Sequence, residues 1–133
     1  MAAGKTRGSA MIGYATIGTN DLERSRDFYD KVLAPLGGKR TMAFPDRMQF
    51  YGAEGRAMLA ITKPYDGGAA TPGNGSMFGI PAASREAADA AHAAALAAGG
   101  TCEGPPGQRM DGFYGAYFRD LDGNKLCVFN TDR

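Results

Sequence analysis

The sequence predicts an α+β protein made of two βαβββ modules, which form a curved mixed sheet around a concave pocket. Three observations lead to this prediction. Residues 17–38 are echoed about 63 positions later by residues 80–100, so the chain reads as a duplicated half. Each copy begins with a short apolar run, continues through a polar cap into a helical pattern, and ends at two glycines. Short β-like segments then follow each helix, which gives both halves the same order of elements.

The first module is expected to span residues 11–63. Its opening strand is the apolar run 11–17, and Asn20 or Asp21 can accept hydrogen bonds from the free N–H groups of the following helix. The helix is predicted to stop at the double glycine 37–38, because glycine readily adopts the left-handed conformation of a helix C-cap. The remaining strands of this module are predicted at residues 39–44, 48–52 and 57–62.

The second module is expected to span residues 76–130. Residues 77–80 form its opening strand, Ser84 can cap an alanine-rich helix, and the double glycine 99–100 ends that helix. The sequence Asp-Gly-Asn at 122–124 is typical of a tight turn between strands, because Gly and Asn tolerate positive φ. The remaining strands are predicted at residues 101–103, 113–119 and 125–130.

The chain has 133 residues, which is enough for one domain with its own core and too few for two. We therefore expect a single domain at residues 11–133, preceded by a disordered leader at residues 1–10. Residues 64–75 are rich in Gly and Pro and are predicted to link the two modules flexibly. The tetrapeptide Phe-Tyr-Gly-Ala occurs at 50–53 and again at 113–116, which supports the duplication without proving it.

Composition excludes several classes of partner. The formal net charge is +1 and no basic run could neutralise a phosphate backbone, so we expect no nucleic-acid partner. The apolar stretches are interrupted well before the roughly 20 residues that a membrane-spanning helix needs, so we expect no membrane partner. Cys102 and Cys127 lack a Cys-x-x-Cys spacing, which argues against a disulfide framework and a structural zinc site. A reducing cytoplasm is the expected location.

Several motifs together resemble the vicinal oxygen chelate superfamily, which includes glyoxalase I, extradiol dioxygenases, fosfomycin-resistance enzymes and bleomycin-binding proteins. The resemblance spans Met11 to Asn130 and implies the glyoxalase/bleomycin resistance/dihydroxybiphenyl dioxygenase fold. The residues that carry it are Ile12-Gly13-Tyr14-Ala15-Thr16-Ile17, Asn20-Asp21-Leu22-Glu23-Arg24-Ser25, Phe28-Tyr29, Gly115-Ala116-Tyr117, Arg119-Asp120 and Asp122-Gly123-Asn124-Lys125.

The resemblance also implies where metal ligands would lie, and the residues there differ from the family's pattern. The positions fall on Tyr14, Met77 and Cys127, where the family has His, Gln or Glu. The fourth position lies in the last strand of the first module, whose register the sequence leaves open and whose only oxygen-bearing side chain is Thr62. His92 is the sole histidine and is interpreted as a helix packing residue. We therefore expect no metal and no other cofactor.

Aromatic side chains on the predicted strands indicate a binding pocket. Alternation sends about half of them to the concave face, where they would suit an apolar or planar ligand. Arg109 and Arg47, in loops that border strands, could pair with an anionic group on that ligand. The candidate pocket residues are Tyr14, Arg47, Phe50, Met77, Tyr114, Tyr117 and Cys127.

The function hypothesis follows from a family scaffold without the family's ligands. It is a metal-independent, bleomycin-resistance-like protein that binds an aromatic or anionic small molecule. By resemblance it would be a homodimer with pockets between paired modules, within one chain or across two. The alternative is a glyoxalase I-like lyase or dioxygenase-related enzyme that uses a divalent metal through atypical ligands, and no catalytic residue is assigned. A third possibility is a dimerising module.

Overall fold

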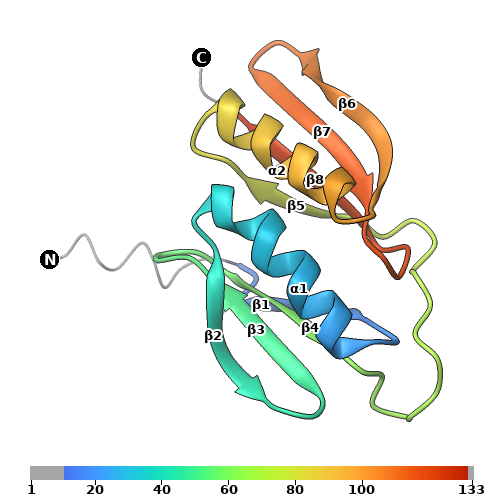
Figure 1. Cartoon of the computed structure of the whole chain (residues 1–133). Coiled ribbons are helices and arrows are strands. Elements are labelled where there is room, and N and C mark those ends of the chain that lie inside the picture. Colours follow the sequence, from blue (N-terminus) through green and yellow to red (C-terminus); the bar gives the residue numbers. More distant parts are fainter. Residues whose placement is uncertain (1–10, 132–133) are drawn as a thin grey trace, which may run out of the picture.

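The computed structural model describes residues 11–131, so the leader predicted at residues 1–10 lies outside the described residues. Figure 1 shows two modules of the same βαβββ order, which confirms the α+β prediction. The first module consists of β1 (Tyr14–Gly18), α1 (Leu22–Leu33), the 3-10 turn η2 (Ala34–Leu36), β2 (Lys39–Phe44), β3 (Met48–Gly52) and β4 (Met58–Thr62). The second consists of β5 (Phe78–Pro81), α2 (Arg85–Ala97), β6 (Thr101–Met110), β7 (Phe113–Arg119) and β8 (Lys125–Asn130).

Each module forms its own four-stranded mixed sheet. The strand orders are β1-β4-β3-β2 and β5-β8-β7-β6, and in both sheets the first strand pairs in parallel with the last. The strands β1 and β5 are therefore edge strands of their sheets, and β5 lies on the side of its sheet that is nearer the first module (Figure 1). No helix within residues 11–131 has the length and apolar content that a transmembrane span requires.

The predicted helix boundaries are confirmed by the caps. Asp21, not Asn20, caps α1 by accepting a hydrogen bond from the backbone N–H three residues later, and Ser84 does the same for α2. After the helices, Gly37 and Gly99 adopt φ of 81° and 103°, which only glycine reaches without strain. The sequence therefore sets where each helix begins and where the chain turns back into a strand.

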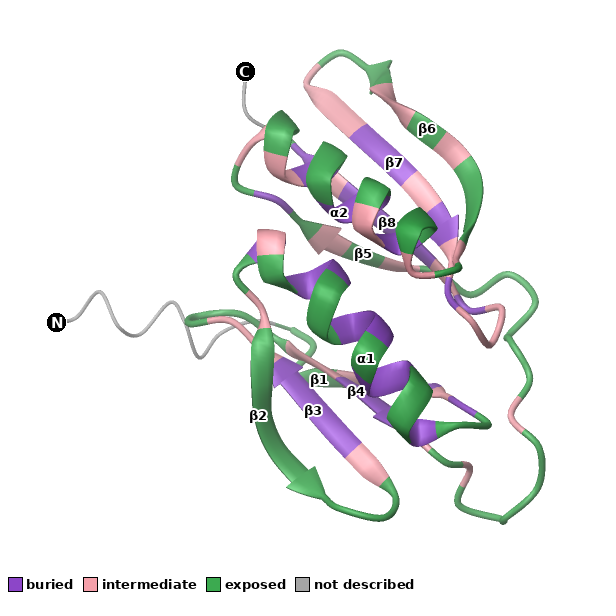
Figure 2. Ribbon diagram, in the orientation of Figure 1, coloured by how far each residue is buried: buried purple, intermediate pink, exposed green. Residues whose placement is uncertain are grey.

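The two helices lie on the same side of the molecule, and each covers one face of its own sheet (Figures 1 and 2). The buried stripe of α1 contains Phe28, Tyr29 and Val32, whereas that of α2 contains mostly alanines. Because alanine side chains are small, α2 packs close to β6, β7 and β8 as well as to α1. Side chains from both helices and both sheets form one continuous hydrophobic core.

His92 belongs to this core, as its interpretation as a packing residue implies. It is 5% exposed on α2, its ring stands at 67° to that of Phe118 with centroids 6.3 Å apart, and its Nε2 atom has no hydrogen-bond partner. Burial lowers the pKa of His92 below 6.5, although a backbone hydrogen bond to Tyr117 and the charge of Asp89 act in the opposite direction. The imidazole is therefore held in its neutral form.

We expect His92 to make stability depend on pH. The unfolded chain takes up a proton near pH 6.5, whereas the folded chain does so only at lower pH. The free energy of unfolding should thus be at its full value above pH 6.5 and fall as the pH is lowered through 6.5 toward the folded pKa. Urea unfolding at pH 7.5, 6.5 and 5.5 measures how the free energy of unfolding depends on pH. The variant His92→Leu should show a weaker dependence. An equal dependence on pH in both proteins would contradict the role assigned to His92.

The strand register shows that the repeated tetrapeptide is not structurally equivalent in the two modules. Phe50 of β3 pairs with Ala60, and Tyr117 of β7 pairs with Cys127. Ala60 and Cys127 hold corresponding places, because each pairs with the corresponding residue of the first strand. Phe50 therefore corresponds to Tyr117 and not to Phe113, since the β6–β7 hairpin is longer than the β2–β3 hairpin. The fold is duplicated, but the tetrapeptide match is a coincidence of sequence.

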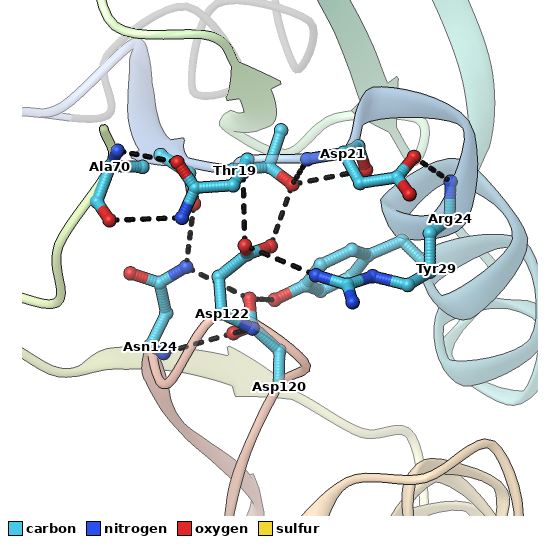
Figure 3. A network of polar contacts seen from close by, with 10 residues as sticks. Thr19, Asp21, Arg24, Tyr29, Ala70, Asp120, Asp122 and Asn124 are labelled. Atoms are coloured by element: carbon cyan, nitrogen blue, oxygen red, sulfur yellow. Dashed lines mark hydrogen bonds and ion pairs between the residues drawn. The ribbon is translucent and has the colours of Figure 1, made fainter. Parts of the chain in front are cut away.

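A polar network joins the two modules of the same chain (Figure 3). It connects the turn between β7 and β8 with the loop between β1 and α1. The Asp122 carboxylate accepts a hydrogen bond from the Thr19 hydroxyl at 2.6 Å and one from the Asn20 backbone N–H at 2.9 Å. Arg24 adds a longer contact of 3.4 Å to the same carboxylate. We call this set of contacts the inter-module network.

Asp120 is the buried half of the inter-module network. One carboxylate oxygen accepts the Tyr29 hydroxyl at 2.6 Å, and the other accepts the backbone N–H groups of Asp122 and Asn124 at 2.9 Å. The Asn124 side chain donates in turn to the backbone carbonyl of Gly18 at 2.9 Å. Burial, followed by the nearby Asp120 charge, raises the pKa of Tyr29 well above 10.0, so its hydroxyl stays a donor.

Candidate functional site

An apolar cleft of about 520 Å³ lies between the two modules. Its walls come from β1, the end of α1 with η2, the β3–β4 hairpin and β5. Among the described residues that line it, Arg56 is the only one with a charged side chain. Arg56 donates to the carbonyl of Leu36 at 3.2 Å and to that of Pro81 at 3.4 Å, so it bridges the modules beside the cleft. The apolar lining includes Ala15, Leu36, Met58, Met77, Phe78 and Ile80.

The sheet faces turned away from the helices carry further aromatic side chains. In the second sheet this open face consists of Phe113, Gly115, Tyr117, Cys127 and Phe129, because the residues that alternate with them lie in the core. The rings of Phe113 and Phe129 stack with centroids 5.4 Å apart. Burial raises the pKa of the Cys127 thiol, so the thiol remains protonated near neutral pH and is neither a ready nucleophile nor a ready metal ligand.

The open face of the first sheet also carries aromatic side chains. The rings of Tyr14 and Phe50 meet edge to face with centroids 5.5 Å apart, and Tyr14 remains 58% exposed at the edge strand β1. Met58, opposite Tyr14 in the sheet, also lines the cleft. Two of the predicted pocket residues are therefore in contact with each other and lie next to the cleft.

The other predicted pocket residues fall in four places, the last of which is that of Tyr114. Met77 lines the cleft, and Tyr117 and Cys127 are direct neighbours on the open face of the second sheet. Arg47 lies at the β2–β3 turn, where its guanidinium stacks 5.6 Å from the ring centroid of Phe44. The structure thus brings Tyr117 and Cys127 together on β7 and β8, and places Met77 at the cleft just before β5 and Arg47 elsewhere.

Tyr114 faces α2 and not the open face. Its hydroxyl donates to the Asp89 carboxylate at 2.6 Å, and the guanidinium of Arg85 lies 4.9 Å from the ring centroid. The hydrogen bond to Asp89 is the largest cause of its raised pKa. Tyr114 therefore joins α2 to β7, and Tyr117, three residues later, takes the place on the open face.

The residues at the four positions where the family resemblance implies metal ligands do not suit a metal ion. The register now identifies the fourth position as Ala60, because Ala60 pairs with Thr16 as Cys127 pairs with Gly79. The four side chains are those of Tyr14, Met77, Ala60 and Cys127, which offer no carboxylate and no imidazole. Within residues 11–131, no three His, Cys, Asp or Glu side chains come together in a group that could hold a metal ion.

Two residues of the cleft, Arg56 and Gly79, were not among the candidates predicted from the sequence. Arg56 follows a turn glycine, and nothing in its neighbours indicates that it reaches across to Pro81 of the other module. Gly79 lines the cleft at a position where a Cβ atom would lie 3.3 Å from the ring of Phe129. A signal for Gly79 was present, because glycine inside a predicted strand indicates a close approach of another group.

These features define the class of protein to which the chain belongs. Two βαβββ modules, with a helix on one face of each sheet and a cleft between the modules, form a duplicated α+β scaffold. The chain belongs to the Glyoxalase/Bleomycin resistance protein/Dioxygenase superfamily, whose pattern matches residues 11–128. The resemblance found in the sequence motifs is confirmed.

Solved structures support the same assignment. A glyoxalase/bleomycin resistance protein from Albidiferax ferrireducens T118 is 45% identical, with a TM-score of 0.86, covering 92% of this chain and 100% of that one. A lactoylglutathione lyase from Agrobacterium tumefaciens is 22% identical, with a TM-score of 0.66 and coverage of 92% and 93%. TioX from Micromonospora sp. ML1 is 16% identical, with a TM-score of 0.62 and coverage of 92% and 100%. The last two show the fold alone. No curated protein matches the chain.

Proposed function

We propose that the protein is a metal-independent, bleomycin-resistance-like member of the superfamily that binds a small molecule. The observation that carries this proposal is the apolar cleft between the modules. Its volume of about 520 Å³ lies within the range of small-molecule sites, and its apolar lining with one cationic side chain is typical of them. The ligand would be aromatic or anionic, in a cytoplasmic protein.

The donor chemistry favours binding over metal-dependent catalysis. An ion of the zinc or magnesium type requires imidazole or carboxylate ligands, which the four implied positions lack. Cys127 would have to lose its proton to become a ligand, and its burial opposes that loss. The alternative, a glyoxalase I-like lyase or a dioxygenase-related enzyme, therefore requires ligands from outside these positions.

The proposal includes a homodimer. The edge strand β1 leaves its backbone groups unpaired on one side, and Ile12 and Tyr14 beside it are 61% and 58% exposed. Met77, next to the other inner edge strand, is 47% exposed. A second copy of the chain would cover these side chains and close the open side of the cleft.

Filling the cleft should weaken the binding of an apolar probe. We expect N-phenyl-1-naphthylamine, a neutral aromatic dye, to bind the protein with micromolar affinity and a rise in fluorescence. The variant Met77→Trp should weaken binding at least about tenfold, because the larger ring occupies the cleft. Met110→Trp is the matched control, since Met110 is also exposed but lies outside the cleft lining.

Two results would contradict the proposed function. One is an absence of dye binding to the native protein, or equal binding by native protein and Met77→Trp. The other is about one equivalent of zinc, iron, manganese or nickel retained through gel filtration, measured by mass spectrometry. The second result would favour the enzyme alternative.

A further inference from the structure

The ring of Tyr117, on the open face of the second sheet, makes cation–π contacts with two side chains. The guanidinium of Arg109 lies 5.3 Å from the ring centroid, and the ammonium of Lys125 lies 5.8 Å from it. These cations come from different strands, β6 and β8, and meet at β7 between them. Two positively charged groups, one from each flanking strand, therefore lie close to the same aromatic ring.

The guanidinium of Arg109 occupies space that Gly104 and Gly107 leave free because they have no side chain. A Cβ atom at Gly107 would lie 2.9 Å from one terminal nitrogen of Arg109, and a Cβ atom at Gly104 would lie 3.2 Å from the other. The second nitrogen also donates to the carbonyl of Pro105. The backbone of β6 therefore holds the guanidinium of Arg109 in place.

Positive charge on this part of the sheet exceeds the negative charge available to it. Glu103 is shared by Arg119 at 3.6 Å and Lys125 at 3.8 Å. Within residues 11–131, no carboxylate lies within ion-pair distance of Arg109. This part of the sheet thus holds three cations and one carboxylate, and Arg109 is the cation without an ion pair among the described residues.

The cationic group is within reach of a ligand in the cleft. Gly79 of β5 lines the cleft and pairs with Cys127 of β8. Cys127 in turn pairs with Tyr117 of β7. Neighbouring strands lie about 4.8 Å apart, so Tyr117 is about 10 Å from the cleft wall. The stacked rings of Phe113 and Phe129 lie on the same face. A ligand of two or three aromatic rings would span this distance.

We propose that the ligand is a planar aromatic anion, whose rings lie in the cleft and whose carboxylate or sulfonate is bound by Arg109 and Lys125 beside Tyr117. This inference rests on the proposed function, because it names the chemical class of ligand for the same binding region. Arginine binds such groups through two parallel N–H bonds, and these gain strength where the surroundings are apolar.

Two dyes with the same ring system test the proposal. 1-Anilinonaphthalene-8-sulfonate carries a sulfonate, whereas N-phenyl-1-naphthylamine carries none. The native protein should bind the sulfonate at least about tenfold more tightly, and Arg109→Met should reduce this ratio to about one. Arg85→Met is the matched control, because Arg85 makes the same kind of contact with Tyr114 on the opposite face of β7. Its ratio should equal that of the native protein.

A second variant tests whether the position of the Arg109 guanidinium matters, and it leaves the charge of Arg109 in place. Gly107→Ala should move the guanidinium away from Tyr117 and lower the preference for the sulfonate, with binding of the neutral dye unchanged. If the native protein binds both dyes equally, or if Arg109→Met keeps the preference, the anion proposal is overturned while the proposed function stands. If the native protein binds neither dye, the proposed function fails as well.

Discussion

The variant Asp120→Ala is expected to lose about 4 kcal/mol of the free energy of unfolding, because several buried donors lose their acceptor together. The Asp120 side chain accepts from the Tyr29 hydroxyl, from the Asn124 amide and from two backbone N–H groups in the β7–β8 turn. Each is a hydrogen bond to a charged group, and Asp120 itself is only 6% exposed. Urea unfolding followed by far-ultraviolet circular dichroism measures the loss.

Two controls separate the network from the loss of a carboxylate in general. Tyr29→Phe removes one of these hydrogen bonds and should cost about 1–2 kcal/mol. Asp66→Ala removes a carboxylate that accepts a backbone N–H bond in an exposed turn, and it should change stability by less than about 0.5 kcal/mol. A loss below about 1 kcal/mol for Asp120→Ala would show that the inter-module network does not hold the modules together.

The inter-module network also affects the shape of the cleft, because the cleft has walls from both modules. Asp122 attaches the β7–β8 turn to the loop after β1, and Arg56 bridges the modules beside the cleft. Both contacts join segments of one chain. The position of β5 relative to β1, and hence the width of the cleft, depends on them. Pairing of the two modules within a chain could not be decided from the sequence, since these contacts link residues about a hundred positions apart.

The fold was predictable because its signals are local. A cap, a helical period and a glycine stop lie within one stretch of sequence, and the duplication repeats them. Ser84 and the two double-glycine stops were therefore assigned in advance, and the first cap was narrowed to Asn20 or Asp21, of which the structure selects Asp21. The same is true of the Asp-Gly-Asn turn. The length of β6 was underestimated, because its glycines and prolines read as loop although they lie in a strand.

The site was less predictable because it depends on the register between strands. Tyr114 and Tyr117 are equally aromatic and lie on the same strand, and only the pairing with β8 shows which of them reaches the open face. The same register identifies Ala60 as the fourth implied metal position, which the sequence left open. Cys127 and Tyr117 were separate pocket candidates in the sequence, and their contact could not be predicted because it depends on the same register. The burial and raised pKa of Cys127 arise from packing.

The variant Gly100→Ala is expected to cost about 3 kcal/mol, since it forces a methyl group into a space that the backbone has already filled. A Cβ atom there would lie 2.7 Å from the carbonyl oxygen of Arg119, 2.9 Å from that of Ala95 and 3.3 Å from the ring of Phe28. The nearest atoms belong to the backbone, so a rotamer change cannot relieve the contact. Gly100 follows α2 and donates its own N–H to Ala95, which fixes the turn into β6.

The duplication supplies a graded set of controls for this variant. Gly38 holds the corresponding place in the first module, where a Cβ atom would meet only the Leu33 side chain at 3.0 Å and its carbonyl at 3.4 Å. Gly38→Ala should therefore cost about 1 kcal/mol, and Gly13→Ala, with no atom within 4 Å, should stay within about 0.5 kcal/mol of the native protein. Urea midpoints at pH 7.5 give the order of the three variants. Equal losses for Gly38→Ala and Gly100→Ala would mean that the cost arises from glycine's backbone freedom at both sites and not from crowding at the junction of α2 with β6.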